Sequence, residues 1–113
     1  MPASKSAVLL RIYTEEGKTS GRRPLYEEIV LKARDMGLAG ATVLRGPMGF
    51  GASARIHTAK ILDLSAKLPL VIEIVDSEPK IRAFVAQLDA IQDLGLVTLE
   101  KVEVLHYGGS SLS

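Results

Sequence analysis

Strand-like and helix-like segments alternate along this chain in an order that restricts its fold. Apolar, β-prone segments with a period of two cover residues 7–13, 40–46, 68–76 and 96–107, the last with an expected break near Lys101. Residues 24–37 and 77–95 instead repeat apolar residues at helical spacing, and each has a proline in its first turn and a glycine at its end. The order βαββαβ predicts an α+β ferredoxin-like sandwich, with a four-stranded antiparallel sheet and two helices on one face.

The sheet face turned away from the helices is expected to carry alternate residues of the two central strands. On the first and third predicted strands these residues are Leu9, Arg11, Tyr13, Val71, Glu73 and Val75. This set is too apolar to be left in water, so we expect oligomerisation to bury it. Arg11 and Glu73 lie on neighbouring strands and can form an ion pair within that interface.

The composition argues against several classes of function. The 113 residues include 14 basic and 13 acidic ones, and the net charge of +1 gives no general attraction for a nucleic acid. The absence of cysteine excludes disulfides, thiolate catalysis and cysteine-rich zinc sites, which is compatible with a reducing compartment. The apolar run at residues 7–10 is too short for a signal peptide or a membrane span, so we expect a cytoplasmic protein.

Residues 47–67 form a connection between the second and third predicted strands that is much longer than a hairpin requires. Such connections are usually functional or partly structured, and the alternation in residues 54–61 predicts that part of this one extends the hairpin. The candidate ligand-binding residues near its start are Arg45, Gly46, Gly49, Phe50, Gly51, Arg55 and His57. Glycines allow backbone N–H groups to approach a phosphate, arginines supply charge, and Phe50 can stack on a base. The composition fits equally a turn in which the glycines adopt positive φ while Met48 and Phe50 pack on a neighbouring subunit.

The loop before the first predicted helix is a second candidate for anion binding. It places Lys18, Arg22 and Arg23 close to a helix N-terminus, and cations together with such a terminus attract anions. The alternative is a solvated loop whose charge is offset by Glu15 and Glu16.

We find no sequence pattern typical of catalysis or of a metal site. There is no thiol and no G-x-S-x-G motif, and the adjacent pairs Glu15–Glu16 and Glu27–Glu28 are expected on solvated surfaces. His57 and His106 are the only histidines, and neither has a second ligand at a metal-binding spacing. We therefore expect neither an enzyme nor a metal site.

Three segments closely resemble the DUF190 (UPF0166) family of small bacterial and archaeal proteins. They are "GRRPLYEEIVLKARDMGLAGATVLRGPMGFG", "LDLSAKLPLVIEIVDSEPKI" and "GLVTLEKVEVLHYG", and they span most of residues 8–108. This family is grouped with the PII-like signalling proteins, which are trimers of ferredoxin-like subunits. The resemblance thus implies one PII-like domain over residues 1–113, with a core of about residues 7–108, assembled as a homotrimer with its sheets turned inward.

In PII proteins a nucleotide lies between subunits, held by the base of the long loop and by a glycine-rich loop between the second helix and the fourth strand. The corresponding connection here, "DLGLVTLEK", lacks the glycine and lysine cluster and so departs from the ATP site of PII proteins. The resemblance implies a non-enzymatic regulator that binds a small anionic metabolite or an adenine nucleotide in intersubunit clefts. Its long loop would contact a partner protein.

Two alternatives remain open. Family members are often encoded near a fluoride-channel-type membrane protein, which implies an interaction module for a membrane channel or transporter that binds no metabolite. The divalent-cation tolerance proteins share the fold, which implies a metal-responsive trimer instead.

Overall fold

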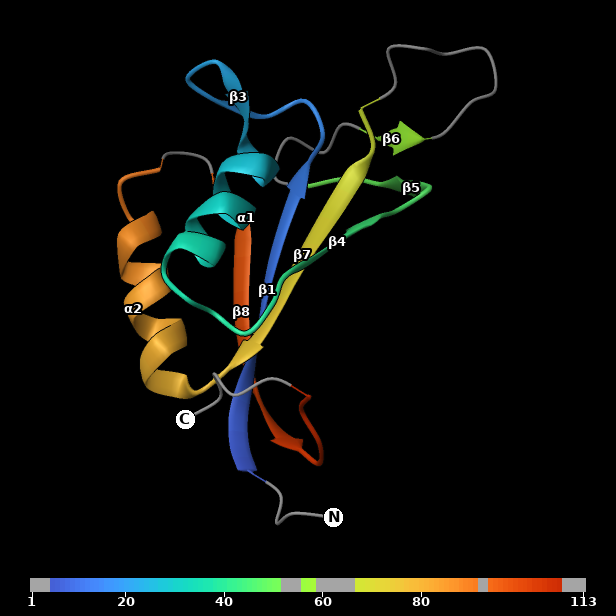
Figure 1. Cartoon of the computed structure of the whole chain (residues 1–113). Coiled ribbons are helices and arrows are strands. Elements are labelled where there is room, and N and C mark those ends of the chain that lie inside the picture. The colour runs from blue at the N-terminus through green and yellow to red at the C-terminus, as the bar shows by residue number, and fades with distance from the viewer. Residues whose placement is uncertain (1–4, 52–55, 59–66, 92–93, 109–113) are drawn as a thin grey trace.

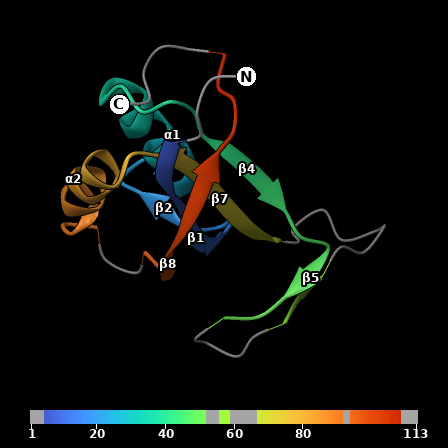
Figure 2. The same ribbon diagram turned by 90° about the horizontal axis from the view of Figure 1, so that it is seen from below.

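A four-stranded antiparallel sheet and two helices make up the computed structural model, which describes residues 5–51, 56–58, 67–91 and 94–108 (Figure 1). The sheet contains β1 (Lys5–Glu15), β4 (Thr42–Arg45), β7 (Pro69–Asp76) and β8 (Leu96–Val104) in the spatial order β4-β7-β1-β8. Both helices, α1 (Leu25–Asp35) and α2 (Glu78–Leu88), cover the same face of this sheet (Figure 2). The predicted ferredoxin-like arrangement is confirmed.

Two short hairpins extend from the end of the sheet that is uppermost in Figure 1. β2 (Thr19–Ser20) pairs with β3 (Arg23–Pro24) in the connection between β1 and α1. β5 (Met48–Gly49) pairs with β6 (His57–Thr58) in the connection between β4 and β7. The β5–β6 hairpin confirms that part of the long connection is paired, whereas the β2–β3 hairpin was not predicted.

The core lies between the two helices and the inward face of the central strands β1 and β7. Ile12 and Ile72 of these strands are fully buried, as are Ile29 of α1 and Phe84 of α2. Removing such a side chain from water stabilises the fold by about 1.5–3 kcal/mol. The remaining core members are Val8, Leu10, Leu25, Ala33, Ile74, Ile81 and Leu88. Because successive strand residues point to opposite faces, the other residues of β1 and β7 must face outward.

Strand β8 differs from its prediction in being continuous. Lys101 pairs with Val8 in the ladder between β8 and β1, and it remains exposed, as a lysine on an edge strand can. The strand is preceded by Gly95, whose φ is 100°. A Cβ at this position would collide with the carbonyl oxygen of Tyr13, so a glycine is needed where β8 begins to pair.

The C-terminal end of α2 also differs from expectation. The segment predicted to be helical runs to residue 95, whereas α2 ends at Leu88 and is followed by a tight turn in which the Ile91 N–H group donates to the Leu88 carbonyl oxygen at 2.9 Å. At the other end Ser77 is the N-cap residue, yet its side chain makes no capping hydrogen bond. The neighbouring carboxylate of Asp76 is fully buried and accepts hydrogen bonds from Ser77 N–H at 2.7 Å and Ala39 N–H at 2.9 Å. Asp76 therefore joins the start of α2 to the connection between α1 and β4.

Candidate functional site

The base of the β5–β6 hairpin is held to the sheet by one acidic side chain and by backbone hydrogen bonds. Glu16, just after β1, accepts a hydrogen bond from Leu68 N–H at 3.1 Å through Oε1, and its Oε2 lies 2.8 Å from Nη2 of Arg45. The Glu16 N–H group also donates to the Leu68 carbonyl oxygen at 3.0 Å. Gly46 N–H donates to the Pro69 carbonyl oxygen at 2.8 Å. Both ends of the long connection are thus fastened beside the end of β1.

Two of the three candidate glycines have a steric role at this base. A Cβ on either Gly46 or Gly49 would lie 3.2 Å from Cγ of Pro69, which is closer than such contacts ordinarily are. Neither of them, nor Gly51, adopts a positive φ, so the expectation of positive φ in this stretch is wrong. Gly51 has open space where a Cβ would be.

The β5–β6 hairpin carries an exposed apolar group, which we call the hairpin cluster: Met48, Phe50 and Ile56. Their exposed fractions are 61%, 71% and 59%. His57 is on β6 opposite Gly49, and Arg55 lies outside the described residues. Phe50 is therefore in contact with solvent.

The second predicted site, the loop before α1, reaches the same end of the sheet as the hairpin base (Figure 1). Arg23 is engaged by the first turn of α1, with Nη1 3.2 Å from Oε2 of Glu28 and Nε 3.9 Å from Oε1 of Glu27. Lys18 closes the loop through its backbone, since its carbonyl oxygen accepts the Leu25 N–H at 2.9 Å. Arg22 is exposed and makes no ion pair with any residue of the described ranges.

Residues that the sequence did not single out complete this end of the molecule. The contact of Glu16 with Arg45 corrects the expectation that Glu16 is merely a solvated charge of its loop. The side chain of Lys67 lies over Gly17, where a Cβ would collide with its Cδ atom. We call Glu16, Arg45 and Lys67 the hairpin-base site.

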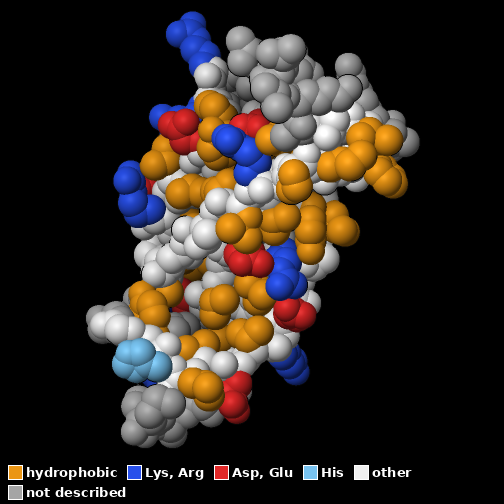
Figure 3. Space-filling model, turned by 90° about the vertical axis from the view of Figure 1, so that its right-hand side faces the viewer, with side chains coloured by type: hydrophobic (Ala, Val, Ile, Leu, Met, Phe, Trp, Pro, Cys, Tyr) orange, Lys and Arg blue, Asp and Glu red, His pale blue; other side chains and the backbone are white. Residues whose placement is uncertain are grey.

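The sheet face opposite the helices is a second candidate surface. Figure 3 shows apolar side chains gathered on this side of the molecule, with charged side chains among them. Tyr13, Leu44 and Leu96 are 39%, 49% and 62% exposed, and the register places them on the same face as Glu73. The apolar outward face predicted from the sequence is therefore present.

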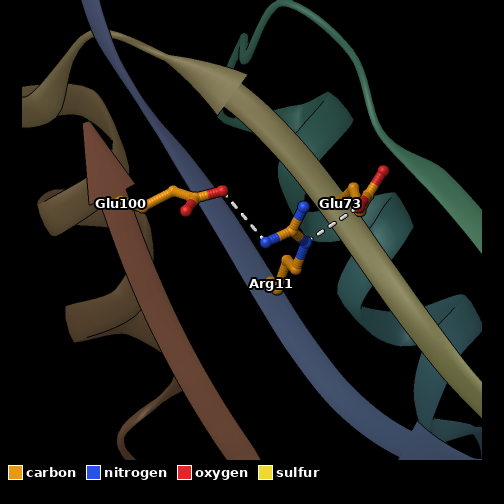
Figure 4. A network of polar contacts seen from close by, with 3 residues as sticks. All are labelled: Arg11, Glu73 and Glu100. Atoms are coloured by element: carbon orange, nitrogen blue, oxygen red, sulfur yellow. Dashed lines mark hydrogen bonds and ion pairs between the residues drawn. The ribbon is translucent and has the colours of Figure 1, made fainter. Parts of the chain in front are cut away.

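A polar network interrupts this apolar face (Figure 4). Nε of Arg11 lies 3.0 Å from Oε2 of Glu73, and Nη1 of Arg11 lies 3.0 Å from Oε1 of Glu100 on β8. The hydrogen bond to Glu73, and then the charges of the two carboxylates, raise the pKa of the Arg11 guanidinium above its ordinary value. The predicted Arg11–Glu73 pair is confirmed, and Glu100 was not predicted.

Neither a metal centre nor a membrane-spanning helix is found within the part of the chain that the structure describes. No group of three or more His, Cys, Asp and Glu residues there could hold a metal ion. No helix there is long and apolar enough to cross a bilayer.

Comparison with protein families identifies the relatives of this chain. The family model DUF190, described as "Uncharacterized ACR, COG1993", matches residues 7–104. The chain belongs to this family. A UPF0166 protein of Aquifex aeolicus (strain VF5) is 40% identical to the DUF190 chain over 98 residues, which cover 87% of the chain and 92% of that protein. A UPF0166 protein of Methanocaldococcus jannaschii is 32% identical over 99 residues, which cover 87% and 91% of the two proteins.

Solved structures similar to the DUF190 chain have the PII-like fold. A structure from Thermus thermophilus, assigned as a PII-like signaling protein, has a TM-score of 0.63 at 17% identity and covers 89% of this chain and 91% of its own. CPII from Thiomonas intermedia K12, bound to ADP and bicarbonate, has a TM-score of 0.66 at 14% identity and covers 90% and 91%. At these identities the likeness establishes the fold.

Proposed function

We propose that the DUF190 chain is a non-enzymatic, cytoplasmic regulator of the PII-like type. It binds a small anionic metabolite, with an adenine nucleotide as the leading candidate, in clefts between the subunits of a homotrimer. The observation that carries the proposal is the hairpin-base site, where Arg45 and Lys67 lie beside the end of β1 from which the loop of Lys18 and Arg22 starts. These cations attract an anion, and the hairpin cluster beside them is free to contact a partner protein.

The fold supports this choice of ligand class. CPII, which has the same fold, is bound to ADP and bicarbonate, both of which are anions. In the DUF190 chain, Arg45 offers a planar guanidinium suited to a phosphate or a carboxylate. Phe50, 71% exposed, offers a ring for a base.

The homotrimer is supported by the apolar sheet face. Leu44, Leu96 and Tyr13 leave this face partly in contact with water in the isolated chain, which favours its burial against further copies. Light scattering is expected to give three times the chain mass of 12.1 kDa. A strict monomer at all concentrations would contradict this part of the proposal.

Calorimetry with AMP, ADP and ATP tests the ligand. We expect at least one nucleotide to bind, and Arg45→Ala and Phe50→Ala to weaken it. Arg34→Ala is the matched control, because its side chain is 76% exposed on the last turn of α1 and should not alter binding. If none of the three nucleotides gives heat of binding, the proposal that the ligand is an adenine nucleotide is contradicted.

The hairpin cluster favours one further candidate function, that of an interaction module for a membrane channel or transporter that needs no metabolite. Three apolar side chains, each more than half exposed, are expected to bind another protein. Pull-down with and without ADP separates the two functions. Capture that ADP leaves unchanged and Phe50→Ser abolishes would favour the interaction module.

A further inference from the structure

Glu16 already forms an ion pair with Arg45, the arginine on which the proposed ligand site depends. Its Oε2 lies 2.8 Å from Nη2 of Arg45, and its side chain is 23% exposed, whereas that of Arg45 is 61% exposed. The guanidinium is therefore held by an internal carboxylate on one side and remains open to solvent on another. A second anion that approaches Arg45 from solvent is repelled by the first.

We infer that Glu16 is an internal competitor for the anionic group that binds Arg45, and that displacement of Glu16 couples ligand binding to the β5–β6 hairpin. The inference rests on the proposed function. An arginine can bind a phosphate or a carboxylate through two parallel hydrogen bonds. The Glu16 carboxylate, 2.8 Å from Nη2, occupies one N–H group of the Arg45 guanidinium and offsets its charge, so a ligand has the full positive charge of Arg45 only when Glu16 moves away.

The coupling follows from the position of Glu16 between the two ends of the long connection. Arg45 precedes this connection and Leu68 ends it, and the Glu16 side chain contacts both. When a ligand takes Arg45, the hydrogen bond from Leu68 N–H to Glu16 can remain. The β4 side of the hairpin is then held by backbone pairing and by the bond from Gly46 N–H to the Pro69 carbonyl oxygen. The hairpin base loses one of its fastenings in the same step in which the ligand binds.

The variant Glu16→Gln tests the competition directly. Glutamine keeps an oxygen that can accept the Leu68 N–H, but it no longer carries the charge that holds Arg45. Glu103→Gln is the matched control, because it removes one negative charge from an exposed position near the other end of β1, opposite Ser6. ADP and inorganic phosphate are titrated separately into wild type, E16Q, E103Q and R45A.

We expect E16Q to bind ADP about twofold to fivefold more tightly than wild type, the range that a partly exposed ion pair represents. E103Q should bind as wild type does, and R45A should bind more weakly. Without ligand, amide hydrogen exchange at Gly46 should be faster in E16Q than in E103Q. If E16Q also binds inorganic phosphate more tightly, by the same factor as ADP, Glu16 competes with the phosphate groups of the nucleotide and not with its adenine ring.

The possible failures can be told apart. If R45A weakens ADP binding but E16Q binds no more tightly than wild type, the inference is overturned while the proposed function stands. If neither ADP nor phosphate binds any of the four proteins, the proposed function falls, and the inference with it. Unchanged exchange at Gly46 in E16Q would overturn the coupling to the hairpin. Should E16Q fail to fold, Glu16→Asp, whose shorter side chain draws the carboxylate back from Arg45, is expected to show tighter binding and faster exchange in the same assays.

Discussion

Arg11 of β1 and Glu73 of β7 are joined across the two central strands by an ion pair of 3.0 Å on the sheet face that the helices leave uncovered. The same guanidinium serves Glu100 of β8, so one cation is shared by two carboxylates. Apolar residues such as Leu44 and Leu96 lie on the same face. If copies of the chain bury this face, the cation becomes essential for assembly.

The first prediction concerns this pair. Arg11→Glu would bring three carboxylates together, so we expect the trimer to dissociate to monomers in light scattering. Adding Glu73→Arg to the same chain restores opposite charges on neighbouring strands and should recover trimer mass. Arg34→Glu, on the exposed end of α1, is the control for net charge. A trimer that persists unchanged in Arg11→Glu would show that this face is not the interface.

Asp76 gives a prediction about stability. Asp76→Ala would leave the N–H groups of Ala39 and Ser77 without their acceptor, at a cost of about 2–4 kcal/mol in the free energy of unfolding. Asp76→Asn keeps one acceptor oxygen and should cost less than Asp76→Ala. Urea unfolding measures both values. An equal loss in the two variants would mean that packing, and not hydrogen bonding, is the role of this side chain.

Gly95 is predicted to tolerate no side chain. Gly95→Ala combines a collision with the Tyr13 carbonyl oxygen and a φ of 100°, and it should destabilise the protein by at least about 2 kcal/mol. Gly40→Ala is the control, since its Cβ would enter open space and its φ is not positive. Thermal unfolding is expected to give a lower midpoint for Gly95→Ala and a midpoint close to that of wild type for Gly40→Ala.

Alanine variants of Gly49 and Gly51 distinguish a glycine needed for packing from a glycine needed for ligand binding. Gly49→Ala presses on Pro69 and is expected to cost about 1 kcal/mol of stability, whereas Gly51→Ala meets nothing and should be neutral. Both variants are then titrated with ADP. Weaker ADP binding by a fully stable Gly51→Ala would mean that the backbone at Gly51 lies close to the ligand.

Much of the fold could be predicted because it depends on local periodicity. Alternation in β1 and β7 decides which residues enter the core, and it leaves Arg11 and Glu73 on the same outward face of adjacent strands. The break predicted near Lys101 is wrong. A charged residue within an apolar segment suggests the end of a strand, but an edge strand such as β8 can accommodate it.

The hairpin-base site was only half predictable. Arg45 and the glycines were found from composition, but Glu16 resembles any solvated carboxylate, and its partners Arg45 and Leu68 lie far along the chain. The contact arises because β7 is flanked by β1 and β4, so the ends of β1 and β4 and the start of β7 are neighbours. A search for acidic residues just beyond a central strand, in the expected strand order, could have found it.

Because Arg45, Gly46, Leu68 and Pro69 are fixed beside the end of β1, residues 47–67 can be exchanged as a unit. Since the two ends are fixed by the sheet, the cost of a longer insert grows only with the logarithm of its length, about 0.6 kcal/mol for each doubling. Relatives could therefore vary the length and sequence of this segment, and so their partners, without altering the register of the strands that carry it.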